Sequence, residues 1–410
     1  MEVRNKVRCS SGPRECRDRR GNPPGSVVLV LVTAGCVLGA CVSESVDGGT
    51  WDWAPSAARG VCAAYLRFQN PGGEVAWVLA DPTEDVRGIW CAGEVRAESA
   101  NCVRWELTGI DEGERLGAAV VVVRDMDGDG WDEIAVGAPG AEGSGMYERG
   151  CVRLVSGRTG TEIWRADGRT AFDQMGTCVG RVSDWNGDGV EDVLACAPGE
   201  DHVRTLWGGC VVVLSGKTGE RLWQADIVEG RQGPGRSVCA VDDLDGDGRE
   251  EIVVGVPSSR GVGSVQVLGS QTGTMVWRVD GTVEEGGFGR EVARTRDFNG
   301  DGVRDILITA PTEGVGGVLH LLSGADGSEL RTLCGNVGEH LGTALFEVPD
   351  LDGDGTPEIG VRYDGADEWR VRVFSGGNLD VIGEYALARL LGVHSVSRSR
   401  VRVGDSTAPR

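Results

Sequence analysis

The sequence of 410 residues has few of the patterns that carry common enzyme chemistry. It contains four histidines, and none stands in the HExxH spacing of a zinc peptidase. No serine lies in the GxSxG pattern of a nucleophile elbow, and the absence of a CxxC pair argues against a zinc site. Carboxylate chemistry, as in a polysaccharide lyase or hydrolase, is the enzyme class that the residues leave open. We therefore expect a non-enzymatic protein.

Apart from the stretch 26–40, the chain has no long apolar run, and it has no helical periodicity. Apolar residues come in short Val, Ile and Leu runs without the 3.6-residue period of a helix, which excludes an α-solenoid. The 67 glycines follow no Gly-X-Y period, so the chain is not collagen-like. Glycines spread between short apolar runs mark turns, and the pattern predicts an all-β fold.

The N-terminal segment 1–41 has the character of an export signal. Its apolar stretch 26–40 has about the length of a signal-peptide core and is too short for a membrane span. The stretch ends in Leu38-Gly-Ala-Cys41, which resembles the bacterial lipobox, in which the cysteine is lipidated. An ordinary cleaved signal peptide is the alternative. We expect an exported protein, lipid-anchored at the cell envelope through Cys41 or extracellular, that meets the membrane only through this anchor.

The charge balance limits the class of partner. The chain has 63 Asp or Glu against 41 Lys or Arg, a formal net charge of -22. Such a chain repels nucleic acid and anionic membrane surfaces and attracts cations. We expect no nucleic-acid partner.

A segment with oxygen side chains at positions 1, 3, 5 and 9 and glycine at position 6 occurs five times, starting at residues 125, 184, 243, 297 and 350. Together with the backbone carbonyl of position 7, these oxygens form the hard-oxygen cage that calcium prefers. Five copies predict up to five calcium ions. The predicted ligands are Asp125, Asp127, Asp129, Trp131 and Glu133; Asp184, Asn186, Asp188, Val190 and Asp192; Asp243, Asp245, Asp247, Arg249 and Glu251; Asp297, Asn299, Asp301, Val303 and Asp305; and Asp350, Asp352, Asp354, Thr356 and Glu358.

These acidic loops are not EF-hands. An EF-hand has a bidentate glutamate at position 12 and a helix on each side. Position 12 here is apolar in every copy, as at Val136 and Ala195, and it falls in a short apolar run. The pattern therefore predicts a loop between two strands.

The loops belong to a longer repeat. Their first aspartates are 59, 59, 54 and 53 residues apart, with a glycine eight residues before each and a proline fourteen residues after the first four. Within the first unit we expect strands at 120–123, 134–138, 151–155 and 161–164. Four short strands per repeat predict a β-propeller of six or seven four-stranded antiparallel blades, five of them with calcium loops.

The domain plan follows from this repeat. After a linker at 42–56, residues 57–107 have four apolar runs at 61–68, 75–80, 89–95 and 102–107 and are expected to form a divergent blade without an acidic loop. Residues 108–385 hold the repeats. Residues 386–410 are either a tail or closing strands.

At these residues the chain resembles FG-GAP repeat proteins, the family that includes the integrin alpha propeller. The GAP part of the family motif, which we call the proline element, stands here as Gly137-Ala-Pro139 and in three variant copies. The FG part is intact at Phe288-Gly289. The fifth repeat departs from the pattern, with Arg362-Tyr-Asp364 in place of the proline element. The resemblance implies a propeller with calcium loops on one face and partner-binding loops on the opposite face. It implies an adhesion or interaction module that binds a protein or carbohydrate ligand.

The hairpin Ser156-Gly-Arg-Thr-Gly160 followed by Trp164 also resembles the tryptophan-docking repeat of quinoprotein dehydrogenases, and Trp223 and Trp277 stand in the same place. We expect these tryptophans to pack neighbouring blades together, and a quinone-dependent dehydrogenase is a minor alternative. Most cysteines are expected to be buried as small apolar residues. Cys62, Cys91 and Cys102 are the best disulfide candidates.

Overall fold

The computed structural model describes residues 64–69, 75–82, 92–99, 102–142, 147–200, 209–227, 237–258, 260–348, 350–364 and 369–386. Every regular element in these ranges is a β-strand. None of the described residues forms a helix long and apolar enough to cross a bilayer. The predicted signal segment with Cys41, the linker 42–56, the side chains of the three disulfide candidates and residues 387–410 lie outside this description.

The strands form six four-stranded sheets in chain order. The first three contain β1 Ala64–Gln69, β2 Val75–Asp81, β3 Glu94–Ser99, β4 Cys102–Thr108; β5 Ala119–Val123, β6 Glu133–Ala138, β7 Cys151–Val155, β8 Glu162–Asp167; and β9 Cys178–Val182, β10 Asp192–Ala197, β11 Cys210–Leu214, β12 Arg221–Asp226. The others contain β13 Ser237–Val241, β14 Glu251–Val256, β15 Ser264–Leu268, β16 Met275–Asp280; β17 Val292–Arg294, β18 Ile306–Ala310, β19 Val318–Leu322, β20 Glu329–Cys334; and β21 Ala344–Val348, β22 Glu358–Asp364, β23 Trp369–Phe374, β24 Val381–Ala386.

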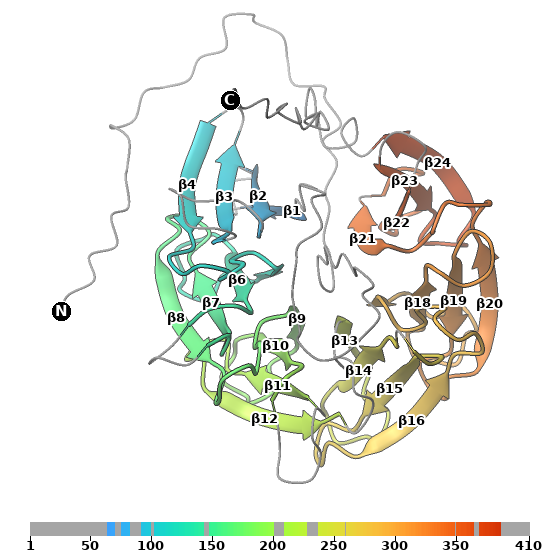
Figure 1. The fold of residues 1–410 in the computed structure, drawn as a ribbon, viewed down its shortest axis with the longest axis horizontal. Coiled ribbons are helices and arrows are strands. Elements are labelled where there is room, and N and C mark those ends of the chain that lie inside the picture. Colours follow the sequence, from blue (N-terminus) through green and yellow to red (C-terminus); the bar gives the residue numbers. More distant parts are fainter. Residues whose placement is uncertain are drawn as a thin grey trace, which may run out of the picture.

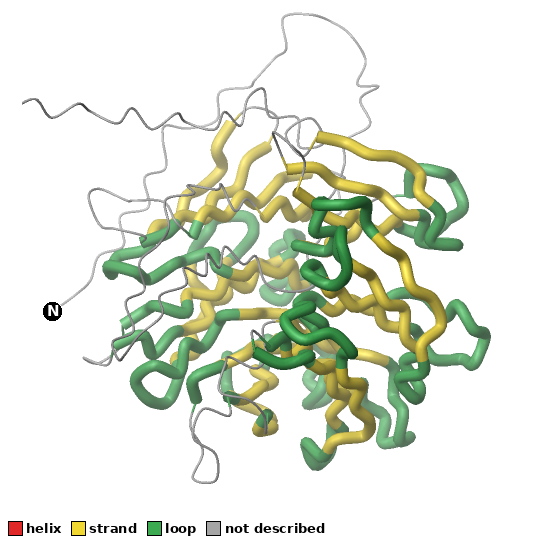
Figure 2. The backbone as a smooth tube through the Cα atoms, turned by 45° about the vertical axis from the view of Figure 1, so that its right-hand side comes forward, coloured by secondary structure: helices red, strands yellow, loops and turns green. Residues whose placement is uncertain are grey.

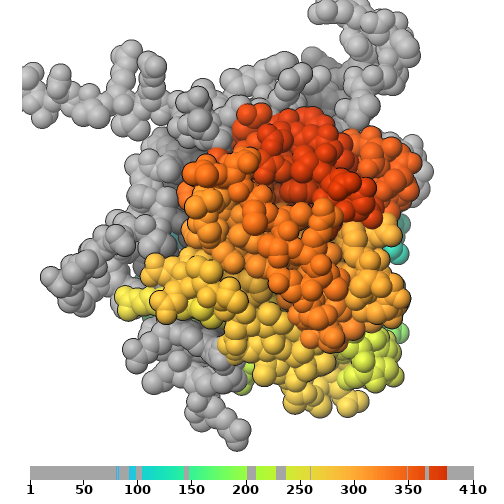
Figure 3. Space-filling view, turned by 90° about the vertical axis from the view of Figure 1, so that its right-hand side faces the viewer, coloured from blue at the N-terminus to red at the C-terminus, as the bar shows by residue number. Residues whose placement is uncertain are grey.

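Each sheet is an antiparallel meander, and the sheets follow one another around a common axis (Figure 1). The first strand of a sheet lies nearest the axis, and β1, β5, β9, β13 and β17 contact one another in that order. The fourth strand lies outermost, and Figure 3 shows the sheets from β17 to β24 packed side by side. This is the predicted all-β propeller, with six sheets in the described part of the chain.

Burial follows the position of a strand in its sheet. All six residues of β6, of β10 and of β14 are buried, because neighbouring sheets cover both faces of these strands. The outer strand β16 is exposed or half-buried along its whole length. The middle strands therefore have continuous apolar sequences, whereas the outer strands combine polar and apolar residues.

The antiparallel order gives the propeller two different ends (Figure 2). The acidic loops join the first strand of a sheet to its second, and the glycine hairpins join the third to the fourth. Both lie at one end, which we call the acidic-loop face. The loops that join the second strand to the third, and one sheet to the next, lie at the other end, which we call the opposite face.

A backbone hydrogen bond recurs between the glycine that precedes an acidic loop and the second strand of the sheet, and it accounts for the fixed spacing of the repeat. The amide of Gly117 donates to the carbonyl of Gly137 at 2.9 Å, and that of Gly176 donates to Cys196 at 3.0 Å. These glycines have positive φ, and a Cβ at Gly176 would lie 2.3 Å from the carbonyl oxygen of Cys151. The fifth repeat keeps the bond, from Gly342 to Arg362 at 3.0 Å, although it lacks the proline element.

The tryptophans join neighbouring sheets, as the sequence predicts. The indole nitrogen of Trp105 donates to the carbonyl of Gly157 at 2.9 Å, that of Trp164 to Gly216 at 2.6 Å, and that of Trp277 to Gly324 at 3.0 Å. In each case the acceptor lies in the hairpin of the next sheet. These tryptophans are packing residues.

One expectation needs correction. The third strand of the divergent sheet is Glu94–Ser99, not 89–95, because the hairpin register that pairs Ser99 with Cys102 sets the strand, and the apolar run does not. The prediction that most cysteines are buried is confirmed for the described side chains: Cys151, Cys178, Cys196, Cys210 and Cys239 are buried, and Cys334 is exposed. His320 lies in β19 and contacts Glu313 at 3.2 Å and Glu329 at 2.8 Å.

Candidate metal centres

The five acidic loops occupy equivalent turns of the propeller. They connect β5 to β6, β9 to β10, β13 to β14, β17 to β18 and β21 to β22. The structure thus places each loop between two strands, as the apolar residue at position 12 predicts. In the described ranges no helix flanks any of them.

The first aspartate shapes each loop. Asp125 accepts hydrogen bonds from the amides of Gly128 at 2.8 Å and Gly130 at 3.0 Å, through its two oxygens. Both glycines have positive φ. Asp184, Asp243, Asp297 and Asp350 accept the same two amide bonds in their own loops. The loop is therefore folded around position 1 by its own backbone.

Positions 3 and 5 form a ladder of short-range bonds. The amide of Asp129 donates to Asp127 at 2.9 Å, and the amide of Trp131 donates to Asp129 at 2.9 Å. Each of these carboxylates uses one oxygen in this ladder, which leaves the second oxygen for another partner. The arrangement recurs in the other four loops.

The carboxylate at position 9 is buried in every copy. Glu133, Asp192, Glu251, Asp305 and Glu358 have no exposed surface, although the residue at position 1 is exposed in four loops and half-buried in the fourth, at Asp297. Each accepts a hydrogen bond from the amide at position 2, for example from Met126 to Glu133 at 2.5 Å and from Trp185 to Asp192 at 2.8 Å. Position 9 therefore closes the loop from the inside.

In most copies the second oxygen at position 9 reaches the hairpin of the same sheet. Asp192 accepts from Gly216 at 2.8 Å, and Glu358 accepts from Gly376 at 2.9 Å. In the first loop this bond is absent, and Oε1 of Glu133 is buried with no hydrogen-bond partner among the described residues. A buried carboxylate oxygen without a partner is costly unless a cation compensates it.

The raised pKa values of the carboxylates at position 9 also favour a bound cation. Burial raises the pKa of Glu133 to about 8, and the carboxylates of Asp127, Asp125 and Asp129 add to the effect. Burial likewise raises the pKa of Asp192, Glu251 and Asp305. A bound cation would remove both costs, since it replaces lost hydration and offsets the repulsion.

Three loops bring their carboxylates close enough to share one ion. Ligand oxygens of Asp125, Asp127, Asp129 and Glu133 lie within 4.8 Å of one another, as do those of Asp243, Asp245, Asp247 and Glu251. In the fifth loop the group comprises Asp350, Asp352 and Glu358, while Oδ1 of Asp354 also accepts from the hydroxyl of Thr356. The second and fourth loops have fewer carboxylates, because Asn186 and Asn299 stand at position 3 and donate to Asp188 and Asp301.

The donor set fits a hard divalent cation. Carboxylate and amide oxygens, with a backbone carbonyl at position 7, are ligands of calcium. The carbonyls of Trp131, Val190, Arg249, Val303 and Thr356 remain predicted ligands. Sequence reasoning missed the hairpin amides that hold position 9, because they lie 18 to 24 residues further along the chain.

Comparison with known proteins agrees with this architecture. The family model described as FG-GAP repeat matches residues 116–146, 234–268 and 288–322. Integrin alpha pat-2 of Caenorhabditis elegans is 29% identical over 266 residues, which cover 56% of this chain and 21% of that protein. Integrin alpha-3 of Cricetulus griseus is 32% identical over 150 residues, which cover 34% of this chain and 14% of that protein. The chain thus spans about a fifth or less of the length of these relatives.

Among solved structures, the rhamnogalacturonan lyase PL11 of Bacillus licheniformis aligns with a TM-score of 0.43 and 15% identity, over 78% of this chain and 56% of that one. The repeats found by the family model coincide with the first, third and fourth acidic loops and the strands around them. The chain is an integrin alpha-like FG-GAP β-propeller.

Proposed function

We propose that the protein is an exported, calcium-stabilised interaction module that binds a protein or carbohydrate through the opposite face of its propeller. The observation that carries this proposal is the distribution of exposed apolar side chains. Ten large apolar residues are exposed in the described part of the chain, and six of them lie in loops of the opposite face: Ile110, Tyr147, Phe172, Val283, Val315 and Val337. The other four lie on the outer strands β8, β16 and β24.

Two aromatic side chains stand out on this face. Tyr147 is 67% exposed and Phe172 is 56% exposed, and the amide of Phe172 donates to the carbonyl of Tyr147 at 2.9 Å. The two loops are therefore joined, and they present both rings to solvent. Exposed aromatic residues held on neighbouring loops are typical of recognition surfaces.

Backbone strain gathers on the same face. Seven described residues other than glycine have positive φ, and six of them lie in opposite-face loops: Arg115, Glu148, Phe172, Gln174, Glu285 and His340. Such conformations cost free energy, and they persist where a site holds its shape. The acidic-loop face has Leu379 alone.

We assign the acidic loops a structural role in this module. The orphaned oxygen of Glu133 and the raised pKa values at position 9 support a bound calcium ion. The loops lie at the far end of the sheets from the apolar side chains, so each ion would hold the scaffold and would not touch the partner. Export, and lipidation at Cys41, are part of the same proposal, and a Cys41→Ser variant that loses incorporated palmitate would support the anchor.

The binding role is tested by capture from the native cell envelope with calcium present. Replacing Tyr147 and Phe172 by serine is expected to abolish capture of the partner. A matched control replaces Met275 and Val276, which are exposed on the outer strand β16, and is expected to leave capture unchanged. Equal loss in both variants would refute the assignment to the opposite face. Cleavage of a polysaccharide by the purified protein would instead favour the enzyme alternative.

A further inference from the structure

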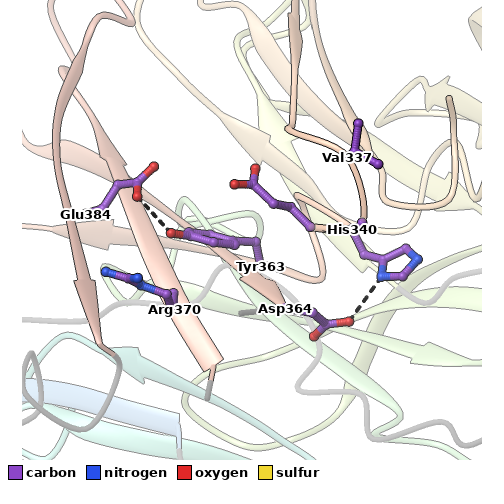
Figure 4. A pocket seen from close by; sticks show the side chains of 8 residues that line it. Val337, His340, Tyr363, Asp364, Arg370 and Glu384 are labelled. Carbon is purple, nitrogen blue, oxygen red and sulfur yellow. Dashed lines mark hydrogen bonds and ion pairs between the residues drawn. The ribbon is translucent and has the colours of Figure 1, made fainter. Parts of the chain in front are cut away.

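The opposite face has a cavity at its last sheet. It has a volume of about 480 Å³ and lies between the loop that joins β20 to β21 and the ends of β22, β23 and β24 (Figure 4). Tyr363 and Asp364 line it, and both belong to the segment that replaces the proline element of the other repeats. The departure from the repeat and the cavity therefore coincide.

The acidic groups in the cavity already have partners. Glu384 accepts from the hydroxyl of Tyr363 at 3.0 Å and from Arg372 at 2.7 Å, and Glu339 accepts from Arg372 at 3.0 Å. Burial by itself raises the pKa values of Glu339 and Glu384. The hydrogen bonds from Arg372, together with those from Asn336 to Glu339 and from Tyr363 to Glu384, outweigh burial and lower both pKa values. These two carboxylates share the guanidinium of Arg372 and form part of the cavity wall.

Arg370 differs from the other charged residues of the wall. It lies directly opposite Tyr363 in the sheet and lines the cavity. Among the described residues its buried Nε has no hydrogen-bond partner, and Figure 4 draws no dashed line between Arg370 and the other residues of the wall. A buried N–H without a partner is costly, and a carboxylate can accept from Nε and a terminal nitrogen of the same guanidinium through two parallel hydrogen bonds.

The rest of the cavity suits hydroxyl groups. Asp364 and His340 are joined at 3.3 Å, and each is about half exposed, so both keep hydrogen-bonding capacity toward the cavity. Val337 at the rim is 83% exposed. The volume lies in the range of small-molecule sites, well above what one carboxylate group occupies. A ligand with one carboxylate and several hydroxyls matches this wall.

We propose that this cavity binds an acidic sugar, a hexuronate, with its carboxylate on Arg370 and ring hydroxyls on Asp364 and His340. This inference rests on the proposed function, because it names the chemistry that one part of the opposite face recognises. It concerns the sixth sheet and not the aromatic pair at Tyr147 and Phe172.

The test is calorimetric titration of the full chain in calcium with glucuronate and galacturonate, and with glucose, galactose and acetate as comparisons. Binding of at least one uronate is expected, with the neutral sugars and acetate at least tenfold weaker. Arg370→Gln is expected to weaken uronate binding roughly ten- to a hundredfold, since it removes charged hydrogen bonds. The uronate affinity of Arg370→Lys should lie between those of the wild-type protein and Arg370→Gln, because lysine keeps the positive charge and loses the two-bond geometry.

Arg260→Gln is the matched control, because Arg260 is an exposed arginine in another loop of the same face. Unchanged melting of each variant confirms folding. The proposal is overturned by failure of both uronates to bind, by equal binding of acetate, or by uronate binding that Arg370→Gln leaves intact. If the uronates fail while the envelope partner is still captured, the cavity assignment is wrong and the proposed function stands. If capture fails while uronate binds, the cavity assignment stands and the proposed function is wrong.

Discussion

The indole nitrogen of Trp164 donates a 2.6 Å hydrogen bond to the carbonyl of Gly216, which lies in the hairpin of the next sheet. The amide of the same glycine donates to Asp192, the ninth residue of an acidic loop, at 2.8 Å. Gly216 therefore joins an acidic loop to the outer strand of the preceding sheet. Trp277, Gly324 and Asp305 repeat the arrangement, with bonds of 3.0 Å and 3.4 Å. A change in the charge of a loop should thus reach the contact between two sheets.

Removal of calcium is expected to destabilise the whole propeller. A ligand that binds only the folded state adds about 2.7 kcal/mol per site at a hundred times its dissociation constant. We expect a chelator to lower the melting temperature by many degrees and added calcium to restore it. The measurement is a thermal melt followed by circular dichroism, with magnesium as the comparison ion. If the melting temperature does not change when chelator is added, the assignment of the loops as metal sites is wrong.

Loss of the Trp164 hydrogen bond should weaken the contact between the second and third sheets. Trp164→Phe leaves the carbonyl of Gly216 without its donor and is expected to cost about 1–3 kcal/mol of unfolding free energy. Trp369→Phe is the control, because Trp369 lies on β23 and its ring contacts Arg362. Denaturant unfolding compares the two variants. Equal costs would show that the Trp164 bond contributes nothing specific.

Gly219→Ala tests the close approach of a hairpin to the same tryptophan. Gly219 has a φ of +74°, and an added Cβ would lie 2.8 Å from the Trp164 ring. The left-handed backbone costs about 1–2 kcal/mol for alanine, and the overlap adds about 1–3 kcal/mol. Gly113 has a φ of +72° and open space where a Cβ would lie, so Gly113→Ala should carry only the cost of the left-handed backbone. The difference between the two unfolding free energies isolates the overlap.

The buried pair of Glu200 and Arg221 should make stability depend on pH. The two side chains are joined at 2.9 Å and 3.0 Å, and Glu200 is 2% exposed. Burial alone raises the pKa of Glu200, but the bonds and charge of Arg221 outweigh it and hold the pKa below its ordinary value of 4.5. Because the folded pKa is lowered, the pair stabilises the protein above pH 4.5, and its contribution is lost as pH falls further.

Arg221→Gln is therefore expected to cost about 3 kcal/mol at pH 7, since it leaves a buried carboxylate with its main partner removed. The cost should shrink as the pH falls below about 4.5, where Glu200 is protonated in the unfolded chain. Arg278→Gln, at an exposed pair with Asp280, should cost less than about 1 kcal/mol at any pH. A cost for Arg221→Gln that stays constant with pH would contradict the pair's role.

Thiol reactivity should separate one described cysteine from the other five. Burial raises the pKa of Cys151 and of Cys239 to about 12, and that of Cys196 also rises. Cys334 is exposed. Alkylation of the native protein followed by peptide mass spectrometry is expected to label Cys334 and to spare Cys151, Cys178, Cys196, Cys210 and Cys239. Rapid labelling of a spared cysteine would show that its sheet opens in solution.

The sequence by itself determined the acidic loops and the strands beside them. The residues of one loop lie within nine positions of each other, so spacing alone brings Asp125 and Glu133 to one point. The alternation of apolar runs with glycine also determined the repeat and the meander order. Local contacts of this kind need no knowledge of the rest of the chain.

Only the tertiary structure decided which residues meet across the repeats. Trp164 and Gly216 are 52 positions apart, and the spacing of the repeat does not say which carbonyl the indole reaches. The cavity depends on four separate segments, which bring Arg370 opposite Tyr363 and close to Glu384. Such contacts follow from how sheets pack around the axis, because packing joins residues whose order in the chain carries no signal of their proximity.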